Sequence, residues 1–295
     1  MKLKLSWLVL IYCWTVAARP RPTVELIVFS KNRPLQLYAF LESCKRYVVG
    51  LDTVSVIYCS DEPFAQAYKE VHACFATVRF MQQAADNPYA DFKKLLCDTV
   101  CLSRATHIIF AVDDIVVIDT VDIHRCATLL EKYRAYGFYL RLGTDITECY
   151  AEECSTGTPK LKLREQDVYS WKFKKGCGDW AYPHTVDMTL FRAEDVYPAA
   201  LFLDYDSPNM FECAWAAQAK PAMKRRGLCC AKSKIVNLPL NLVQQDFLEN
   251  RHSSECDVHF LLEKFQQGFR MDIQALHQFP HKAPHADYVP TFIPR

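Results

Sequence analysis

The chain has 295 residues, which is enough for one large domain or two small ones. Hydrophobic residues make up 51% and aromatic residues 13%, so the composition predicts a sizeable core and excludes a disordered chain. The 35 Lys and Arg residues nearly balance 34 Asp and Glu residues, so the chain lacks the basic excess of a nucleic-acid-binding protein.

The first 18 residues have the layout of a secretory signal peptide or signal anchor. A basic start is followed by an almost wholly apolar run, residues 5–18, which ends in small residues before Arg19. This run is short for a membrane span, which needs roughly 20 residues. A working leader implies the secretory route, or membrane association through the N-terminus. A start codon placed upstream of a cytoplasmic domain is the alternative.

The 14 cysteines are scattered along the chain and form no C-x-x-C pair, so a zinc ribbon or thioredoxin-type motif is not expected. Cys44, Cys97 and Cys101 fall on apolar faces of predicted helices, where free cysteine acts as a small hydrophobe. Thirteen cysteines follow the leader, and this odd number argues against a complete disulfide framework. The leader and the cysteines therefore point to different compartments.

Strand-like and helix-like segments alternate in the first half of the chain. The expected strands cover residues 24–30, 54–59, 77–80, 107–112 and 136–142, and the expected helices cover 34–48, 64–74, 91–104 and 121–134. This alternation predicts an α/β fold with a mainly parallel sheet and helices on both faces. The loops after the first, second and fourth strands then meet at one edge of the sheet.

The second half is more irregular. We expect a polar, irregular stretch at residues 148–171 and a glycine- and aromatic-rich loop at residues 172–184. A strand at residues 186–192, a helix at residues 207–218 and a last strand at residues 231–241 are expected to follow. The tail after about residue 246 carries one weak helix and four prolines, which predicts extended structure. The expected organisation is one domain over residues 22–245 and a C-terminal extension over 246–295.

The most informative stretch is residues 107–119, in which an apolar run ends in Asp113 and Asp114 and a second apolar run follows. A short continuous apolar run indicates a strand buried on both faces. Acidic side chains at the end of such a strand lie where open α/β sheets place their ligands. Two carboxylates there suit a divalent cation, which would neutralise a diphosphate. The alternative is that the two residues merely end the strand and start a turn.

Four segments, in the same order, resemble GT-A-fold glycosyltransferases of the family-2-like kind. Residues 28–37, VFSKNRPLQL, are similar to the first strand and turn that hold the nucleotide, and residues 111–114 to the D-x-D metal motif. Residues 179–192 resemble the acceptor-side segment. Residues 208–215 resemble the acidic helix start that often carries the base.

The resemblance covers roughly residues 24–244 and implies a GT-A-like (Rossmann-like) fold, with a mixed, mainly parallel sheet flanked by helices in a single domain. One position departs from the pattern, because a strict D-x-D motif would have an acid at Val112. The number of protein ligands to a metal is therefore left open.

On this resemblance, Asp113 and Asp114 would hold Mn²⁺ or Mg²⁺ as a Lewis acid behind the departing diphosphate. The residues expected to bind the nucleotide sugar are Ser30, Arg33, Asp61, Lys94 and Asp113. The alternatives are a solvated turn for Arg33, a turn-forming aspartate for Asp61 and a solvated surface lysine for Lys94.

An acceptor hydroxyl needs a general base if the anomeric centre inverts, and Glu212 and Asp179 are the candidates. The alternative for Glu212 is a reciprocal helix cap with Asn209. The alternative for Asp179 is a loop carboxylate paired with a lysine such as Lys174.

Aromatic side chains beside Asp179 suit a sugar ring, so Trp180 and Tyr182 are expected on the acceptor side. His184 stands alone in a loop and is not expected to bind metal.

These observations predict a metal-assisted, hexosyltransferase-type glycosyltransferase that moves a sugar from a nucleotide-sugar donor to a glycan, lipid or protein acceptor. One alternative is a catalytically inactive GT-A-like binding protein. A nucleotidyltransferase would need a glycine-rich loop after the first strand, and residues 30–34 contain no glycine. A secreted interaction protein stapled by disulfides is the remaining alternative.

Overall fold

The structure is a computed structural model that describes residues 21–84, 86–249, 251–253 and 256–295. The leader predicted over residues 1–18 lies outside the described residues. Within the described part of the chain, no helix combines the length and the apolar character that crossing a membrane requires.

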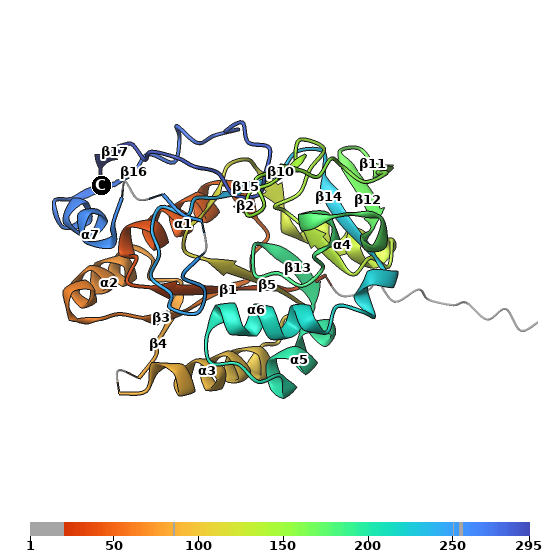
Figure 1. Cartoon of the computed structure of the whole chain (residues 1–295). Coiled ribbons are helices and arrows are strands. Elements are labelled where there is room, and N and C mark those ends of the chain that lie inside the picture. The colour runs from red at the N-terminus through yellow and green to blue at the C-terminus, as the bar shows by residue number, and fades with distance from the viewer. Residues whose placement is uncertain (1–20, 85, 250, 254–255) are drawn as a thin grey trace, which may run out of the picture.

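A nine-stranded sheet runs through the centre of the molecule (Figure 1). Seven strands point in one direction, and β12 and β13 point in the other. The α/β class with a mixed, mainly parallel sheet is therefore confirmed. In spatial order the strands are β11 (Lys162–Glu165), β12 (Val168–Lys172), β14 (Arg226–Cys230), β8 (Gly137–Tyr139), β13 (Thr189–Arg192), β5 (His107–Val112), β1 (Val24–Lys31), β3 (Thr53–Cys59) and β4 (Arg79–Gln82).

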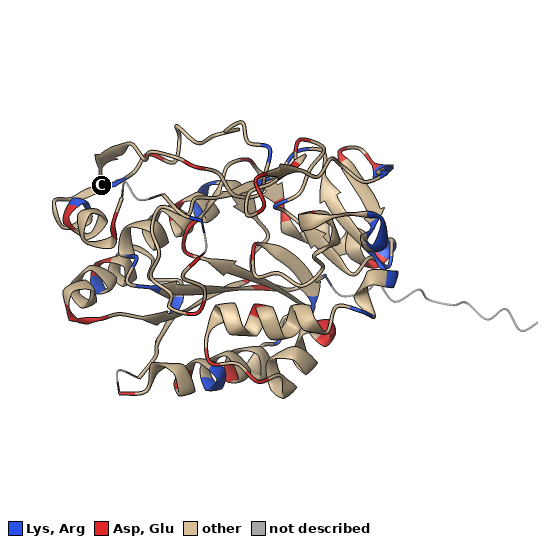
Figure 2. Ribbon diagram, in the orientation of Figure 1, with Lys and Arg blue, Asp and Glu red and all other residues tan. Residues whose placement is uncertain are grey.

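Helices cover both faces of this sheet (Figure 1). One face carries α1 (Pro34–Tyr47), α2 (Glu62–Cys74), α4 (Ile123–Lys132) and α7 (Val258–Gln266), and the other carries α3 (Pro88–Leu102), α5 (Ala193–Phe202) and α6 (Pro208–Ala217). Alternate residues of β1 feed the two cores, with Val28 on the first face and Phe29 on the second. The same alternation in β5, with Ile109 on the first face and Phe110 on the second, buries that strand on both sides, as its continuous apolar run predicts. Figure 2 shows that the charged residues lie mostly on helices and loops around the largely uncharged strands.

Short elements complete the fold where the sequence showed no clear period. The stretch expected to be irregular folds into two hairpins, β9 (Glu148–Cys149) with β10 (Cys154–Ser155), and β11 with β12. The expected last strand is β15 (Ile235–Asn237), which pairs with β6 (Ile115–Val117) outside the main sheet. The remaining short elements are β2 (Val48–Val49), β7 (Val121–Asp122), β16 (Phe269–Met271), β17 (Phe292–Pro294) and three 3-10 helices, η1 (Phe173–Lys175), η2 (Gly178–Ala181) and η3 (Ala222–Lys224).

The C-terminal extension packs back onto the domain, instead of running along its surface as an extended tail. Leu261 and Phe265 of α7 are buried in the same core as α1. At the end of the chain, β17 pairs with β16, and the Arg295 guanidinium lies 3.8 Å from the centre of the Phe265 ring. The extension therefore contributes to the core on the α1 face of the sheet.

Replacing Phe265 tests this contribution. We expect Phe265→Ala to lower the free energy of unfolding by about 3–5 kcal/mol, because it leaves a cavity under α1. Phe260→Ala on the same helix is the matched control. Its side chain is 37% exposed, so we expect a loss below about 1 kcal/mol. Urea unfolding followed by circular dichroism measures both, and equal losses would contradict a shared core.

Candidate active site

A cleft of about 540 Å³ lies where β1, β3 and β5 end. Its walls also include residues from α6, from the β9–β10 hairpin and from the C-terminal extension. The lining carries seven carboxylates but only four Lys or Arg side chains. The carboxylates belong to Asp113, Asp114, Asp179, Asp187, Asp206, Glu212 and Asp246, and the basic residues are Lys31, Arg33, Arg141 and Arg251. The cleft is therefore electronegative.

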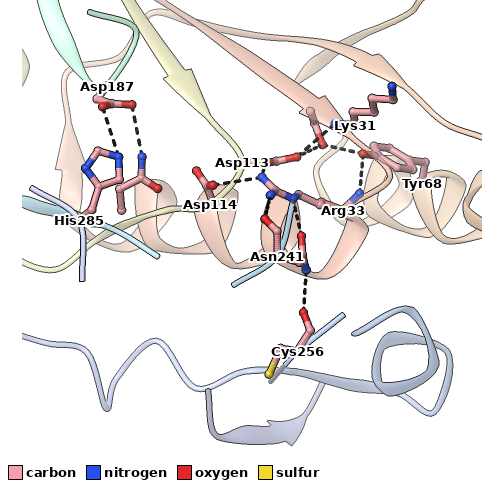
Figure 3. Close-up of polar contacts among 11 residues, drawn as sticks. Lys31, Arg33, Tyr68, Asp113, Asp114, Asp187, Asn241, Cys256 and His285 are labelled. Carbon is pink, nitrogen blue, oxygen red and sulfur yellow. Dashed lines mark hydrogen bonds and ion pairs between the residues drawn. The ribbon is translucent and has the colours of Figure 1, made fainter. Parts of the chain in front are cut away.

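Arg33 lies at the centre of the polar network (Figure 3). Its Nη1 donates to Asp113 Oδ1 and to Asp114 Oδ2, both at 3.1 Å. Its Nε donates to the side-chain oxygen of Asn241 at 2.8 Å, and its Nη2 donates to the Asn241 backbone oxygen. One buried guanidinium thus joins the ends of β1 and β5 to a segment of the C-terminal half.

Asp113 uses both of its oxygens within the protein. Oδ2 accepts hydrogen bonds from the Ser30 hydroxyl at 2.7 Å and from the Lys31 backbone N–H at 3.2 Å, and Oδ1 accepts from Arg33. Burial raises the pKa of Asp113, and Arg33 and these donors oppose that effect. This carboxylate holds the first turn after β1 in place.

Asp114 is different, because its Oδ1 is buried and has no hydrogen-bond partner within the described residues. Burial raises the pKa of Asp114 to about 6; Arg33 opposes the rise, while Asp113 and Asp187 add to it. Figure 3 shows Asp114 between Arg33 on one side and Asp187 with His285 on the other. A free carboxylate oxygen in an electronegative cleft is a site where a cation would be stabilised.

Asp187 and His285 form a second polar group beside Asp114. Asp187 accepts a hydrogen bond from the Asn237 side chain at 3.3 Å, and His285 Nε2 lies 4.0 Å from its carboxylate. Sequence reasoning missed both residues as site residues. Asp187 lies inside the expected strand 186–192, whose alternation of polar and apolar residues does not mark it as a site residue. His285 lies between prolines in the tail, where no local pattern points to a site.

Glu212 of α6 lines the cleft, and its Oε1 accepts a hydrogen bond from the Val186 N–H at 3.0 Å. The helix is capped by the Ser207 hydroxyl, which accepts from Met210 N–H, so the reciprocal cap with Asn209 is not formed. Burial, reinforced by Asp187, raises the pKa of Glu212 to about 7. A carboxyl group with this pKa can exchange protons at neutral pH.

Asp179 also lines the cleft, but it forms an ion pair with the fully buried Arg141. The expected alternative of a paired carboxylate is therefore observed, with an arginine in place of Lys174. Tyr182 lines the cleft beside this pair. Trp180 is fully buried, and its indole N–H donates to the Ile146 backbone oxygen, so its ring packs in the core.

The structure brings some of the expected nucleotide-binding residues together and leaves others apart. Ser30, Arg33 and Asp113 line the cleft. Asp61 is exposed and bonds to Asn32 outside the cleft lining. Lys94 is exposed on α3, away from the residues that line the cleft in the described part of the chain. His184 lies between the Tyr136 hydroxyl and the Trp215 backbone oxygen in the core.

No family model matches the sequence. A curated relative, the bifunctional glycosyltransferase pgtA of Dictyostelium discoideum, is 25% identical over 191 residues, or 59% of this chain. The chain resembles glycosyltransferases. The matched region spans 24% of that relative, so this chain corresponds to about a quarter of its length.

Two solved structures are also similar. One is S. aureus TarS 1–349 in complex with UDP-GlcNAc, with a TM-score of 0.49 and 10% identity, covering 80% of this chain and 61% of that one. The other is GalNAc-T7 with UDP, GalNAc and Mn²⁺, with the same TM-score and identity, covering 82% of this chain and 47% of that one.

The pH dependence of stability tests the electrostatics of Asp114. The folded chain holds a proton on Asp114 up to about pH 6, whereas an exposed Asp releases it near pH 3.9, so raising the pH removes stability from the wild type. Asparagine does not titrate. We therefore expect Asp114→Asn to gain about 1–3 kcal/mol relative to the wild type between pH 4 and pH 7.

Asp119→Asn is the control for this measurement. The ion pair and hydrogen bond with Lys234 outweigh burial and lower the pKa of Asp119. The stability that the Asp119 carboxylate contributes is therefore present above the pKa that an Asp has in the unfolded chain, and it is lost only in more acidic solution. Urea unfolding at a series of pH values should give this variant a constant difference from the wild type above about pH 4.5. A constant difference for Asp114→Asn would contradict the raised pKa.

Proposed function

We propose that the protein is a glycosyltransferase that moves a hexosyl group from a nucleotide sugar to an acceptor hydroxyl, assisted by a divalent cation. The observation that carries the proposal is the electronegative cleft at the end of β5, where Asp114 Oδ1 has no partner among the described residues. The resemblance of the sequence to a bifunctional glycosyltransferase supports it. A glycan, a lipid or a protein remains open as the acceptor.

The charge balance of the cleft argues for a cation with the donor. Arg33 already shares its charge between Asp113 and Asp114, and Asp187 lies beside them. A diphosphate brought next to these carboxylates would be repelled unless a cation came with it. A divalent cation supplies this neutralisation and acts as a Lewis acid on the leaving diphosphate.

The donor set fits such a cation through Asp114. No group of three or more His, Cys, Asp or Glu side chains that could hold a metal ion occurs within the described ranges. Mg²⁺ needs no such group, because it is often held by one or two carboxylates together with substrate phosphates. Asp114 would hold the ion, while Asp113, with both oxygens engaged, would position Arg33 and the first turn.

The nucleoside is expected at the β1–β3–β4 side of the cleft. Cys59, Gln83 and Tyr89 line this side, and Lys31 Nζ lies 5.8 Å from the centre of the Tyr89 ring. An aromatic face and a cation suit a nucleobase and a phosphate, respectively. This arrangement leaves the opposite side, at Tyr182 and Glu212, for the acceptor.

Glu212 is the base that the geometry favours over Asp179. The pKa of about 7 suits a group that takes up a proton near neutral pH. The negative charge of Asp179, by contrast, is compensated by its ion pair with Arg141. In the proposed step, Glu212 accepts the proton of the acceptor hydroxyl while the oxygen of that hydroxyl forms a bond to the anomeric carbon. The bond from that carbon to the diphosphate breaks, and a direct displacement of this kind inverts the anomeric centre.

Donor binding and turnover test the role of Asp114. Purified wild-type protein is screened with nucleotide sugars and Mn²⁺ for hydrolysis or transfer, next to Asp114→Ala and Asp61→Ala. We expect Asp114→Ala to lower kcat at least about 100-fold. It should also lose the Mn²⁺-dependent rise in melting temperature with a nucleoside diphosphate, because binding stabilises the folded state. Asp61→Ala, outside the cleft, should retain both.

Equal turnover by the wild type and Asp114→Ala would remove the metal role. Metal-dependent binding of the nucleoside diphosphate without turnover of any nucleotide sugar would instead favour an inactive binding protein.

The pH profile of transfer tests Glu212. We expect kcat/KM of the wild type to rise with pH through the pKa of about 7 and to level off about one pH unit above it, because the base must be ionised. Glu212→Gln should lower kcat about 10²–10⁴-fold and remove this dependence, with little change in donor binding. Glu194→Gln on the exposed side of α5 is the control and should behave like the wild type. A large residual rate in Glu212→Gln with an unchanged profile would exclude Glu212 as the base.

A further inference from the structure

Three cysteines gather beside the cleft, at the β9–β10 hairpin. Cys149 is buried, whereas Cys154 and Cys177 are exposed. Cys154 is an electrostatic neighbour of both other thiols. Cys177 Sγ donates to the backbone oxygen of Thr156, next to the end of β10, at 3.1 Å. The hairpin and the segment before Asp179 therefore bring three sulfur atoms into one small region.

The strand register places two of these cysteines opposite each other. Cys149 and Cys154 are direct partners in the antiparallel β9–β10 pair. Side chains at such positions lie on the same face of the hairpin, and their Cα atoms are typically about 4.5–5.5 Å apart. Disulfide bridges need Cα atoms about 4.4–6.8 Å apart, and the typical separation of directly opposed residues falls within this range.

The hairpin is held against a segment that leaves room for it. Gly178 has a φ of 51°, and a Cβ atom at this position would lie 3.8 Å from Cys149 Sγ and 3.1 Å from the Thr156 side chain. On the other side, Cys149 and Tyr150 line both the cleft and a neighbouring hollow of about 570 Å³. The paired cysteines thus stand at the wall between two cavities.

We propose that Cys149 and Cys154 form a reversible disulfide bridge across the hairpin, with the exposed Cys154 reacting first. The observation that carries this is the direct register of the two cysteines. The bridge would close a loop of four residues, 150–153, at the wall of the cleft. The inference concerns the covalent state of the chain and stands apart from the proposed sugar transfer.

The chemistry requires a disulfide oxidant such as oxidised glutathione. The Cys154 thiolate attacks one sulfur of glutathione disulfide and releases one glutathione thiolate, which takes up a proton. The Cys149 thiolate then attacks Cys154 Sγ and releases the second glutathione. Two protein thiols are oxidised and one glutathione disulfide is reduced, so electrons and protons balance.

The surroundings of Cys154 limit the rate of this exchange. Local desolvation of the thiolate and the neighbouring carboxylate of Glu152 raise the pKa of the exposed Cys154, so its thiolate is scarce at neutral pH. Bridge formation should therefore be faster in mildly alkaline buffer and faster in Glu152→Gln than in the wild type.

A disulfide map tests the proposal. The full chain is equilibrated with an excess of oxidised over reduced glutathione, free thiols are blocked by alkylation, and the protein is cut after glutamate under non-reducing conditions. Cleavage after Glu148, Glu152 and Glu153 places Cys149 and Cys154 on separate peptides, which stay joined only through a disulfide. We expect mass spectrometry to find the joined pair in most molecules, and reduction to separate it.

Single-cysteine variants give this result its controls. Cys154→Ser should abolish the joined pair, and Cys149 should then be recovered as a free thiol. Cys177→Ser and Cys74→Ser, which removes an exposed thiol at the end of α2, should leave the pair intact. Either of two results would overturn the proposal: a Cys154–Cys177 link in place of the pair, or a wild-type chain that carries only glutathione on Cys154.

Discussion

The site depends on one buried guanidinium between two neighbouring carboxylates. Arg33 compensates the charge of Asp113 and Asp114, which would otherwise be destabilising at the end of a buried strand. Because the guanidinium carries one charge and faces two carboxylates, the compensation is incomplete. A residual negative charge therefore stays at the end of β5 when both carboxylates are ionised, and this residual charge is what makes the cleft suited to a cation.

The sheet explains why these groups meet. Strands β1 and β5 are parallel neighbours, so the turn after β1 and the two aspartates after β5 lie at the same edge. The reversed strand β13 begins near this edge, which places Asp187 beside Asp114. Glu212 reaches the same cleft from α6 and is fixed by the Val186 N–H just before that strand. Three segments thus contribute acidic groups to one small volume, and the turn after β1 contributes the guanidinium between two of them.

The sequence predicted the parallel half of the fold well, because there each strand has its own apolar run and each helix its own period. Residues 24–31 and 107–112 were found within one residue of their observed ends. Hairpins such as β9–β10 were missed, since strands of two residues carry no period and form only through pairing. Arg33, Asp113, Asp114 and Glu212 were recognised as candidates, whereas the orphaned oxygen of Asp114 and the approach of His285 arise from tertiary packing alone.

The contact between Arg33 and Asn241 joins residues 208 positions apart. During synthesis on the ribosome, the turns that carry Arg33 and both aspartates emerge long before Asn241, and His285 emerges later still. A partly made chain can build the parallel half of its sheet, but its charged centre stays open to water until the segments that carry Asn241 and His285 fold over it. Any binding competence of this centre is therefore acquired only after the segments that carry Asn241 and His285 have been made and have packed against it.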